Sequence, residues 1–238
     1  MTLAGTNTWL LSHGAGSYVV IDPGPMMHEE QIMSLTGGRV SAIMLTHRHG
    51  NASACAAVLA ARSLAPVYAM DPKFASDNKG ILRSGQVLKF DELMVLVMAT
   101  SGHTSDSVAF LVTSDDEIAL LTGDTILGDG ASITTFSDGD IGAYLRSLDS
   151  LEYLVRRQTK QVPLLPGHGD AHNDSLGLIN KYRTNRLQRL AQIRVAVDQG
   201  VTDIERIVDL VYKDVPDEVR PAAIMSVEAQ LAYLNENG

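Results

Sequence analysis

The sequence predicts an α/β fold with a small helical C-terminal domain. Two observations carry this prediction. Over residues 1–174, apolar runs of strand length alternate with helical stretches in two successive halves. From residue 175 onward the strand pattern stops, and helical patterns follow to the end of the chain. We therefore expect one domain of sheets and helices over 1–174 and a helical domain over 175–238.

The first half is predicted to hold four strands and one helix. The strands are expected at residues 7–11, 17–21, 40–46 and 66–70. The first two form a hairpin that ends in the sharp turn Asp22-Pro23-Gly24, because proline fixes φ and glycine frees it. The Ala-rich stretch 52–62 has helical spacing, and Asn51 before it is a favoured N-cap residue.

The second half is predicted to hold five strands and one long helix. The strands are expected at residues 87–90, 93–99, 108–112, 118–121 and 162–165. Residues 141–155 repeat apolar side chains at positions i, i+3, i+4 and i+7. This spacing predicts an amphipathic helix that packs one face on a sheet.

The C-terminal part is predicted to contain three helices. The first runs from Ser175 to about Gln199 and is closed by Gly200. The pattern Thr202-Asp203-Ile204-Glu205 is typical of a capping box, and it opens a helix that ends at Tyr212. Residues 222–234 form the last amphipathic helix.

Composition points to a globular chain in a reducing compartment. With 238 residues and 45% hydrophobic content, the chain can bury a sizeable core. No apolar run has the length of a membrane span, and no basic start precedes an apolar stretch at the N-terminus. We therefore expect a cytoplasmic protein with no membrane partner. The single cysteine, Cys55, lies in an apolar helical run, which favours a packed thiol over a nucleophile.

Five potential metal ligands each follow an apolar run. They are His47, His49, His103, Asp124 and His168. We expect these side chains to converge, because strand ends can meet at one rim and imidazole is the commonest side-chain ligand for divalent metals. His13 and His28 match no metal motif and are expected to be loop histidines.

The order of these motifs resembles the metallo-β-lactamase-fold superfamily, and within it the branch typified by lactamase-like protein 2. The motifs are Ile21-Asp22-Pro23-Gly24, His47-Arg48-His49, Gly102-His103-Thr104, Gly123-Asp124-Thr125 and Pro166-Gly167-His168-Gly169. The resemblance implies an αββα sandwich followed by a winged-helix-like tail. It also reveals a departure, since the pattern His-x-His-x-Asp-His of that family ends here in Asn51 and Ala52.

The resemblance divides the ligands into two sets. The first set is complete and comprises His47, His49 and His103. The second set keeps His168 and shares Asp124 with the first, but it lacks its other two ligands. Asn51 offers only a neutral amide and Ala52 offers no donor atom. We therefore expect at most one divalent metal, with zinc favoured and iron or manganese as alternatives.

The resemblance also suggests roles for three further groups. Asp22 corresponds to an acid that braces the metal-site loops, so we expect it to support the site. Asp124 is the only acid left in the constellation and is the candidate general base. Asn51 cannot accept a proton, but it can hydrogen-bond a hydroxide, and we count both Asp124 and Asn51 as candidate catalytic residues.

These observations predict a metal-dependent hydrolase that cleaves a small-molecule ester, thioester or phosphoester. One alternative is a catalytically degenerate member with a binding or scaffolding role. A further alternative is an RNA-binding or nuclease-like protein that uses the five bases between Lys181 and Arg194. The net charge of −9 disfavours nucleic acid, and the basic stretch is interpreted as a solvated face. The oligomeric state is left open.

Overall fold

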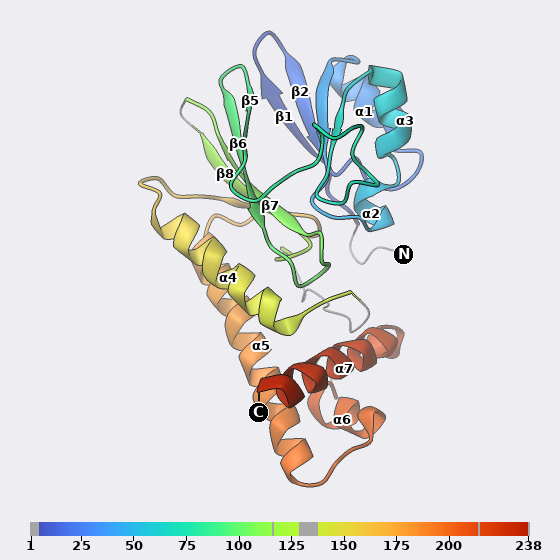
Figure 1. Cartoon of the computed structure of the whole chain (residues 1–238), viewed down its shortest axis with the longest axis vertical. Helices are drawn as coiled ribbons and strands as arrows, with labels where there is room; N and C mark the ends of the chain where they lie inside the picture. Colours follow the sequence, from blue (N-terminus) through green and yellow to red (C-terminus); the bar gives the residue numbers. More distant parts are fainter. Residues whose placement is uncertain (1–4, 116, 129–137, 214, 238) are drawn as a thin grey trace.

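Two β-sheets lie at the centre of the N-terminal part in a computed structural model (Figure 1). The structure describes residues 5–115, 117–128, 138–213 and 215–237. The first sheet contains β1 (Trp9–His13), β2 (Ser17–Ile21), β3 (Val40–Met44) and β4 (Val67–Tyr68), in that order. β1 and β2 form the predicted antiparallel hairpin, whereas β2, β3 and β4 are parallel.

The second sheet follows the order of the chain. It contains β5 (Val87–Phe90), β6 (Leu93–Ala99), β7 (Val108–Thr113), β8 (Ile118–Gly123) and β9 (Leu164–Pro166). β5 to β8 form an antiparallel meander, and β9 adds in parallel to β8. The long connection from β8 to β9 contains α4 (Ile141–Arg156), as expected for a parallel crossover.

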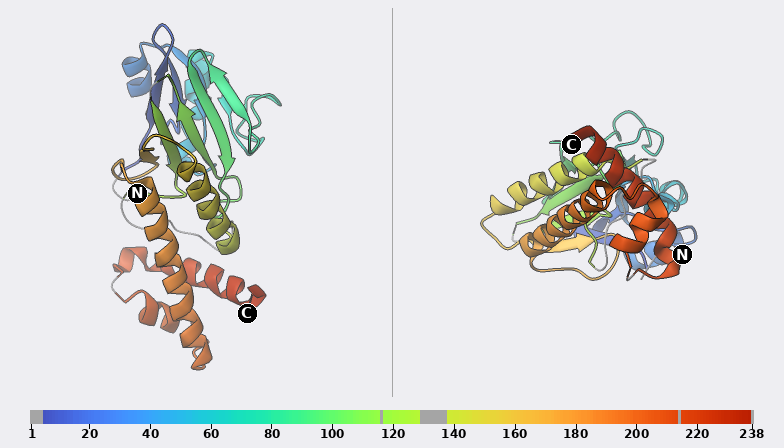
Figure 2. Two further views of the ribbon diagram at one scale, coloured as in Figure 1. Left: turned by 90° about the vertical axis from the view of Figure 1, so that its left-hand side faces the viewer. Right: turned by 90° about the horizontal axis from the view of Figure 1, so that it is seen from below.

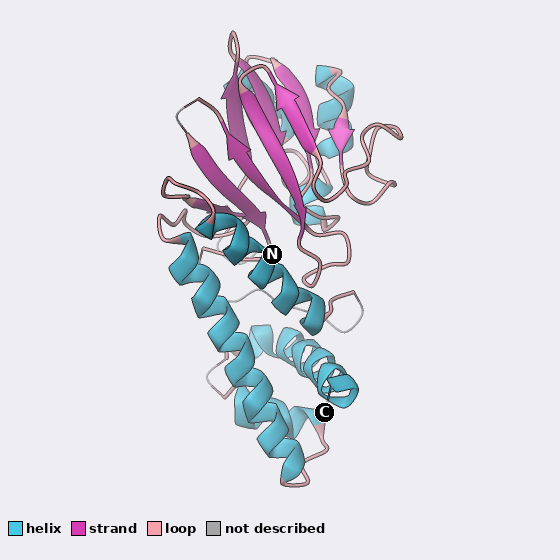
Figure 3. Cartoon of the chain, turned by 60° about the vertical axis from the view of Figure 1, so that its left-hand side comes forward, coloured by secondary structure: helices cyan, strands magenta, loops and turns pink. Residues whose placement is uncertain are grey.

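The two sheets pack face to face and carry helices on their outer sides (Figures 2 and 3). Ala42 and Met44 of β3 point into the core between the sheets, where Phe110 of β7 lies. The alternate residue Ile43 packs outward against α1 (Glu29–Thr36) and α3 (Ala56–Ser63). On the other side, α4 covers the second sheet and buries Tyr144. These four layers confirm the predicted αββα sandwich.

The C-terminal helices extend from the second sheet to the far end of the molecule. They are α5 (Ser175–Asp198), α6 (Ile204–Val211), the short 3-10 helix η1 (Asp217–Val219) and α7 (Arg220–Asn237). The first turns of α5 bury Ile179 and Tyr182 against the sandwich, whereas Ile193 packs with α6 and α7. One helix therefore belongs to both cores, and Figure 1 shows it running between them.

The structure corrects one predicted helix. Residues 52–62 do not form a single helix, because a turn at Ala54 and Cys55 separates α2 (Gly50–Ser53) from α3. The N-cap of α2 is His49, so Asn51 lies inside the helix and is not its cap. Cys55 is buried as expected, its thiol donates a hydrogen bond to Glu29, and burial raises the pKa of the thiol to about 11.

Two smaller corrections concern polar residues. His13 is not a loop residue but ends β1, where its buried ring hydrogen-bonds with Asp91 and Ser41. The side chain that caps α6 is that of Asp203 and not that of Thr202, since it accepts the hydrogen bond from the backbone amide of Arg206.

Among the described residues, no helix is both long and apolar enough to cross a membrane.

Candidate metal centre

Six of the seven predicted site residues stand just beyond the carboxyl ends of strands that share a direction within their sheet, and the seventh, Asn51, lies in α2. Asp22 follows β2, His47 and His49 follow β3, His103 follows β6, Asp124 follows β8 and His168 follows β9. β2 is parallel to β3, and β9 is parallel to β8. Two antiparallel pairings, β6 with β7 and β7 with β8, give β6 and β8 a common direction. The sandwich therefore delivers these side chains to a single edge.

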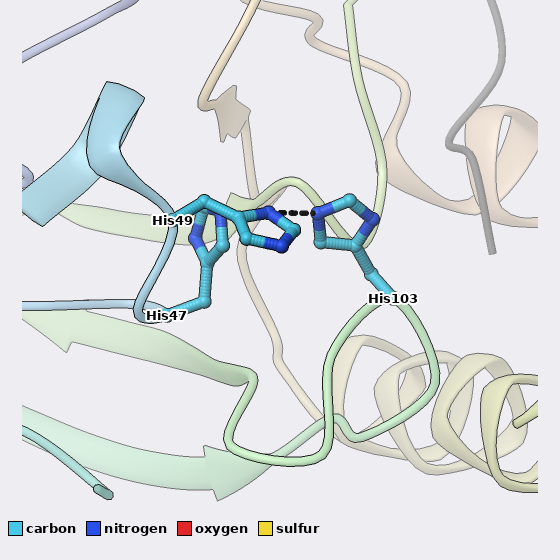
Figure 4. Close-up of side chains that lie close together, drawn as sticks. All are labelled: His47, His49 and His103. Atoms are coloured by element: carbon cyan, nitrogen blue, oxygen red, sulfur yellow. Dashed lines mark hydrogen bonds between the residues drawn. The ribbon is translucent and has the colours of Figure 1, made fainter. Parts of the chain in front are cut away.

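Three imidazole rings converge at this edge (Figure 4). His47, His49 and His103 each offer a nitrogen within 4.8 Å of the nitrogens of the other two. Nε2 of His103 lies 3.1 Å from Nδ1 of His49, and the ring centroids are 4.9 to 5.2 Å apart. His47 is buried whereas His49 is exposed, so the cluster is open to solvent on the His49 side.

A chain of hydrogen bonds sets the tautomer of His47. Thr46 donates its only hydroxyl proton to Oδ2 of Asp22 at 2.7 Å, and its backbone amide donates to Oδ1 at 2.8 Å. Oγ1 of Thr46 can then only accept a proton from Nδ1 of His47, which lies 3.0 Å away. Nε2 of a neutral His47 therefore carries its lone pair toward the cluster, as metal-binding histidines require.

The imidazole cluster fits a divalent metal. Nε2 of His47 is buried and has no hydrogen-bond partner among the described residues, which is costly unless a cation is bound there. Two nitrogens that bind one zinc ion at ~2.0–2.1 Å in tetrahedral geometry lie roughly 3.3 Å apart. The 3.1 Å between the nitrogens of His49 and His103 is close to this spacing. His47, His49 and His103 would hold the metal.

Asp124 lies between this cluster and His168. Its Oδ2 is 3.5 Å from Nε2 of His47, 3.8 Å from Nε2 of His103 and 3.2 Å from Nε2 of His168. Burial opposes a charge on Asp124, but the His168 and His47 rings beside it outweigh this effect and hold the pKa of the carboxyl well below its ordinary value. Asp124 is therefore a charged acceptor that takes up a proton poorly.

The surroundings shift the pKa values of the histidines in different directions. Burial lowers the pKa of His49, and the neighbouring His47 lowers it further, so the neutral form that a metal needs is favoured. The carboxylate of Asp124 beside the ring raises the pKa of His168, because it favours the protonated form. Burial alone would lower the pKa of His47, but Asp124 reverses the effect and raises it. A proton on His47 would have to leave before this ring could bind a metal.

The residues of a second metal set do not fit a second ion. Ala52 is buried and has no donor atom, as the sequence indicates. The amide nitrogen of Asn51 donates to Oδ2 of Asp124 at 3.2 Å and approaches Nε2 of His168 to 3.0 Å. The two remaining ligands of that set are thus already hydrogen-bonded within the protein.

Sequence reasoning missed the role of Arg48. Its guanidinium lies 3.1 Å from Oγ of Ser105 and 3.3 Å from Oδ1 of Asp106, and it also pairs with Asp138. Arg48 therefore ties the His47–His49 loop to the loop that carries His103. Its place between two histidine ligands was the only signal in the sequence. Asp138 comes directly after positions 129–137, which lie outside the described residues.

Removing the charge of Asp22 is expected to change how stability depends on pH. Burial raises the pKa of Asp22 from 3.8 to about 6, against the opposing effects of His47 and Thr46. Between pH 4 and 6 the folded protein binds more protons at this site than the unfolded chain, so stability falls as pH rises. In Asp22→Asn this contribution is absent. From pH 4 to pH 7 the free energy of unfolding of the variant should therefore rise by about 2–3 kcal/mol relative to that of the parent.

The measurement is urea unfolding of metal-free protein at pH 4, 5, 6 and 7 for the parent and Asp22→Asn. The difference between the two curves reports the titration of Asp22 together with any change in that of His47, whose charge interacts with Asp22. Parallel curves would show that Asp22 does not titrate in this range.

The basic stretch of α5 is largely engaged inside the protein. Arg186 is buried with its guanidinium over the ring of Tyr144, and Arg189 lies over the ring of Tyr212. Arg183 pairs with Asp149 and Glu152 of α4. These three arginines hold α5 against its neighbours.

The four-layer fold and the cluster of imidazoles at its strand ends define a metal-binding α/β protein. A sequence model of the metallo-beta-lactamase superfamily matches residues 1–168, and one of the beta-lactamase associated winged helix domain matches residues 204–238. The chain belongs to the metallo-beta-lactamase superfamily. This fold implies binding of a divalent metal, in agreement with the cluster.

Known relatives align with most or all of the chain. Beta-lactamase-like protein 2 homolog of Drosophila melanogaster is 28% identical over 100% of this chain and 85% of its own length. Atrochrysone carboxyl ACP thioesterase of Aspergillus chevalieri is 26% identical over 93% of this chain and 72% of its own length. A metallo-beta-lactamase family protein from Thermus thermophilus has the same fold, with a TM-score of 0.77, 20% identity and coverage of 98% and 89% of the two chains.

Proposed function

We propose that this protein is a hydrolase that uses one divalent metal to cleave an acyl ester or thioester. The observation that carries the proposal is the convergence of His47, His49 and His103, with the buried Nε2 of His47 lacking a partner among the described residues. Three neutral imidazoles with an open position form a known catalytic zinc set, and we propose zinc as the metal. Iron and manganese also accept such ligands, and metal analysis distinguishes the three.

The side chains around the cluster would position the attacking water and the substrate. A bound divalent metal supplies Lewis-acid activation of water and of the substrate carbonyl. Asp124 would orient the attacking water by accepting its hydrogen bond, since its lowered pKa makes it a poor proton acceptor. Asn51 directs its amide protons at Asp124 and His168, which favours positioning of these groups over contact with substrate. The exposed side at His49 would admit the substrate.

Two observations favour acyl substrates over phosphodiesters. The ligands for a second metal are incomplete, and efficient phosphodiester cleavage commonly uses a pair of metals that clamp the attacking and leaving oxygens. A relative that aligns with 93% of this chain is described as a carboxyl ACP thioesterase. A binding or scaffolding role is the second candidate, because Asn51 hydrogen-bonds the two ligands that would otherwise take the second ion.

Hydrolysis of three generic substrates tests the proposal. The assays use p-nitrophenyl acetate, the acetyl thioester of N-acetylcysteamine and bis(p-nitrophenyl) phosphate, before and after chelation and after return of zinc, iron or manganese. We expect turnover of the ester or thioester that chelation abolishes and one metal restores. Turnover that survives chelation would contradict the proposal. Bound metal without turnover of any substrate would favour the binding role.

A further inference from the structure

Two atoms of types that bind metals, one from His168 and one from Asp124, lie in contact outside the imidazole cluster. Nε2 of His168 is 3.2 Å from Oδ2 of Asp124. Nδ1 of His168 donates its proton to the backbone carbonyl of Gly5, so Nε2 of the neutral ring carries a lone pair. A lone pair and a carboxylate oxygen at this distance repel each other unless a positive group lies between them.

The side-chain amide of Asn51 supplies that positive group. Its nitrogen lies 3.0 Å from Nε2 of His168 and 3.2 Å from Oδ2 of Asp124. An amide NH2 has two protons, and it can donate one to each acceptor. The alternative, a His168 ring protonated at Nε2, would place two donors face to face at 3.0 Å. The distances therefore match a neutral ring bridged to Asp124 by Asn51.

The local backbone fixes the amide in this place. α2 begins at Gly50, directly after His49, so Asn51 occupies its first turn and is carried by the same loop as two of the clustered histidines. Ala52 beside it offers no donor, and among the described residues the one group of three or more ligand side chains that lie within 4.8 Å of one another is His47, His49 and His103. Nothing else in this part of the chain would complete a second set around Asp124 and His168.

We propose that the Asn51 amide is a built-in substitute for a second cation. It holds Asp124 and His168 side by side by donating a hydrogen bond to each. It also occupies the position that an ion between them would take. Asn51 is thus a positioning residue that makes the centre mononuclear. This inference rests on the metal centre of the proposed function but not on hydrolysis, so loss of activity alone does not decide it.

Converting the amide to a carboxylate is the direct test. Asn51→Asp replaces the two protons with a ligand oxygen and places a second negative charge beside Asp124. We expect zinc stoichiometry at saturation to rise from one per chain in the parent toward two in the variant. Asn51→Ala removes the protons without adding a ligand and should stay at one. Asn78→Asp, which adds the same charge at an exposed loop position, controls for charge alone.

Thermal stability gives a second readout that is independent of activity. Without metal, Asn51→Asp should melt at least about 3 °C below the parent because two carboxylates face each other, and zinc should raise its Tm more than that of the parent. Asn51→Ala should also melt lower without metal. An Asn51→Asp variant that binds one zinc ion and responds to zinc as the parent does would overturn the proposal.

A measurement on the parent covers the case in which the variants do not fold. Long-range proton–nitrogen NMR spectra of metal-free protein at pH 8 report the protonation of His168. We expect a ring with a proton on Nδ1 and an unprotonated, hydrogen-bonded Nε2. A ring protonated on Nε2 would show that the amide does not bridge the pair, and the proposal would fail whether or not the protein hydrolyses esters.

Discussion

Replacing His103 with alanine is expected to remove the metal and all metal-dependent hydrolysis. The change leaves two of three imidazoles, and the contact at 3.1 Å between His103 and His49 is lost. Removing a group that only supports a ligand already costs about 10–100-fold in metal affinity, so loss of a ligand should cost more than about a hundredfold. The side chain is only partly buried, and the fold should persist.

The measurement combines bound metal after dialysis with kcat/KM on the ester and thioester substrates. His13→Ala serves as the matched control, because His13 ends β1 at the opposite end from the strand termini that carry the site. The control should lose stability through its contacts with Asp91 and Ser41 but keep its metal. If His103→Ala keeps a full complement of metal, the proposed ligand set is incorrect.

A methyl group at Gly102 is expected to cause the largest loss of stability among the single changes considered. Gly102 has φ of +139°, a conformation that side chains rarely adopt. A Cβ there would lie 2.5 Å from Cα of Tyr144 and 2.6 Å from its backbone nitrogen, so the helix α4 itself would have to move. Strain and overpacking together should cost about 3 kcal/mol or more in Gly102→Ala.

The effect should reach the metal, because Gly102 immediately precedes His103. Asp140 donates its backbone amide to the carbonyl of Gly102, so the histidine loop is docked on the start of α4. Gly85→Ala is the matched control, since Gly85 has φ of +82° but open space around a Cβ, and it should lose only about 1 kcal/mol. Urea unfolding and metal analysis compare the two variants. Equal losses in both would show that backbone strain alone explains the effect.

The sequence predicts the strands well because their residues are apolar on both faces or alternate regularly. β3 is an example, since Met44 faces the opposite sheet and Ile43 faces a helix, and both are buried. Asp124 and His168 could be placed at one edge for the same reason, as each follows a buried strand.

What the sequence does not predict depends on contacts between distant segments. Asn51 has the properties of an N-cap, but Asp124 and His168, which are 73 and 117 positions away, provide the partners its amide donates to. The bridging role of Arg48 depends likewise on Ser105 and Asp106 across the site. Local propensity contains no information about either arrangement. The boundary of the helical domain at residue 175 stays a prediction.

Metal content per chain at saturation tests the mononuclear centre most directly. The purified protein is saturated with zinc, weakly bound metal is removed by gel filtration, and zinc is measured against protein by elemental analysis. We expect one ion per chain in the parent and none in His103→Ala. Two ions per chain in the parent would contradict it, because Asn51 would then not exclude an ion between Asp124 and His168.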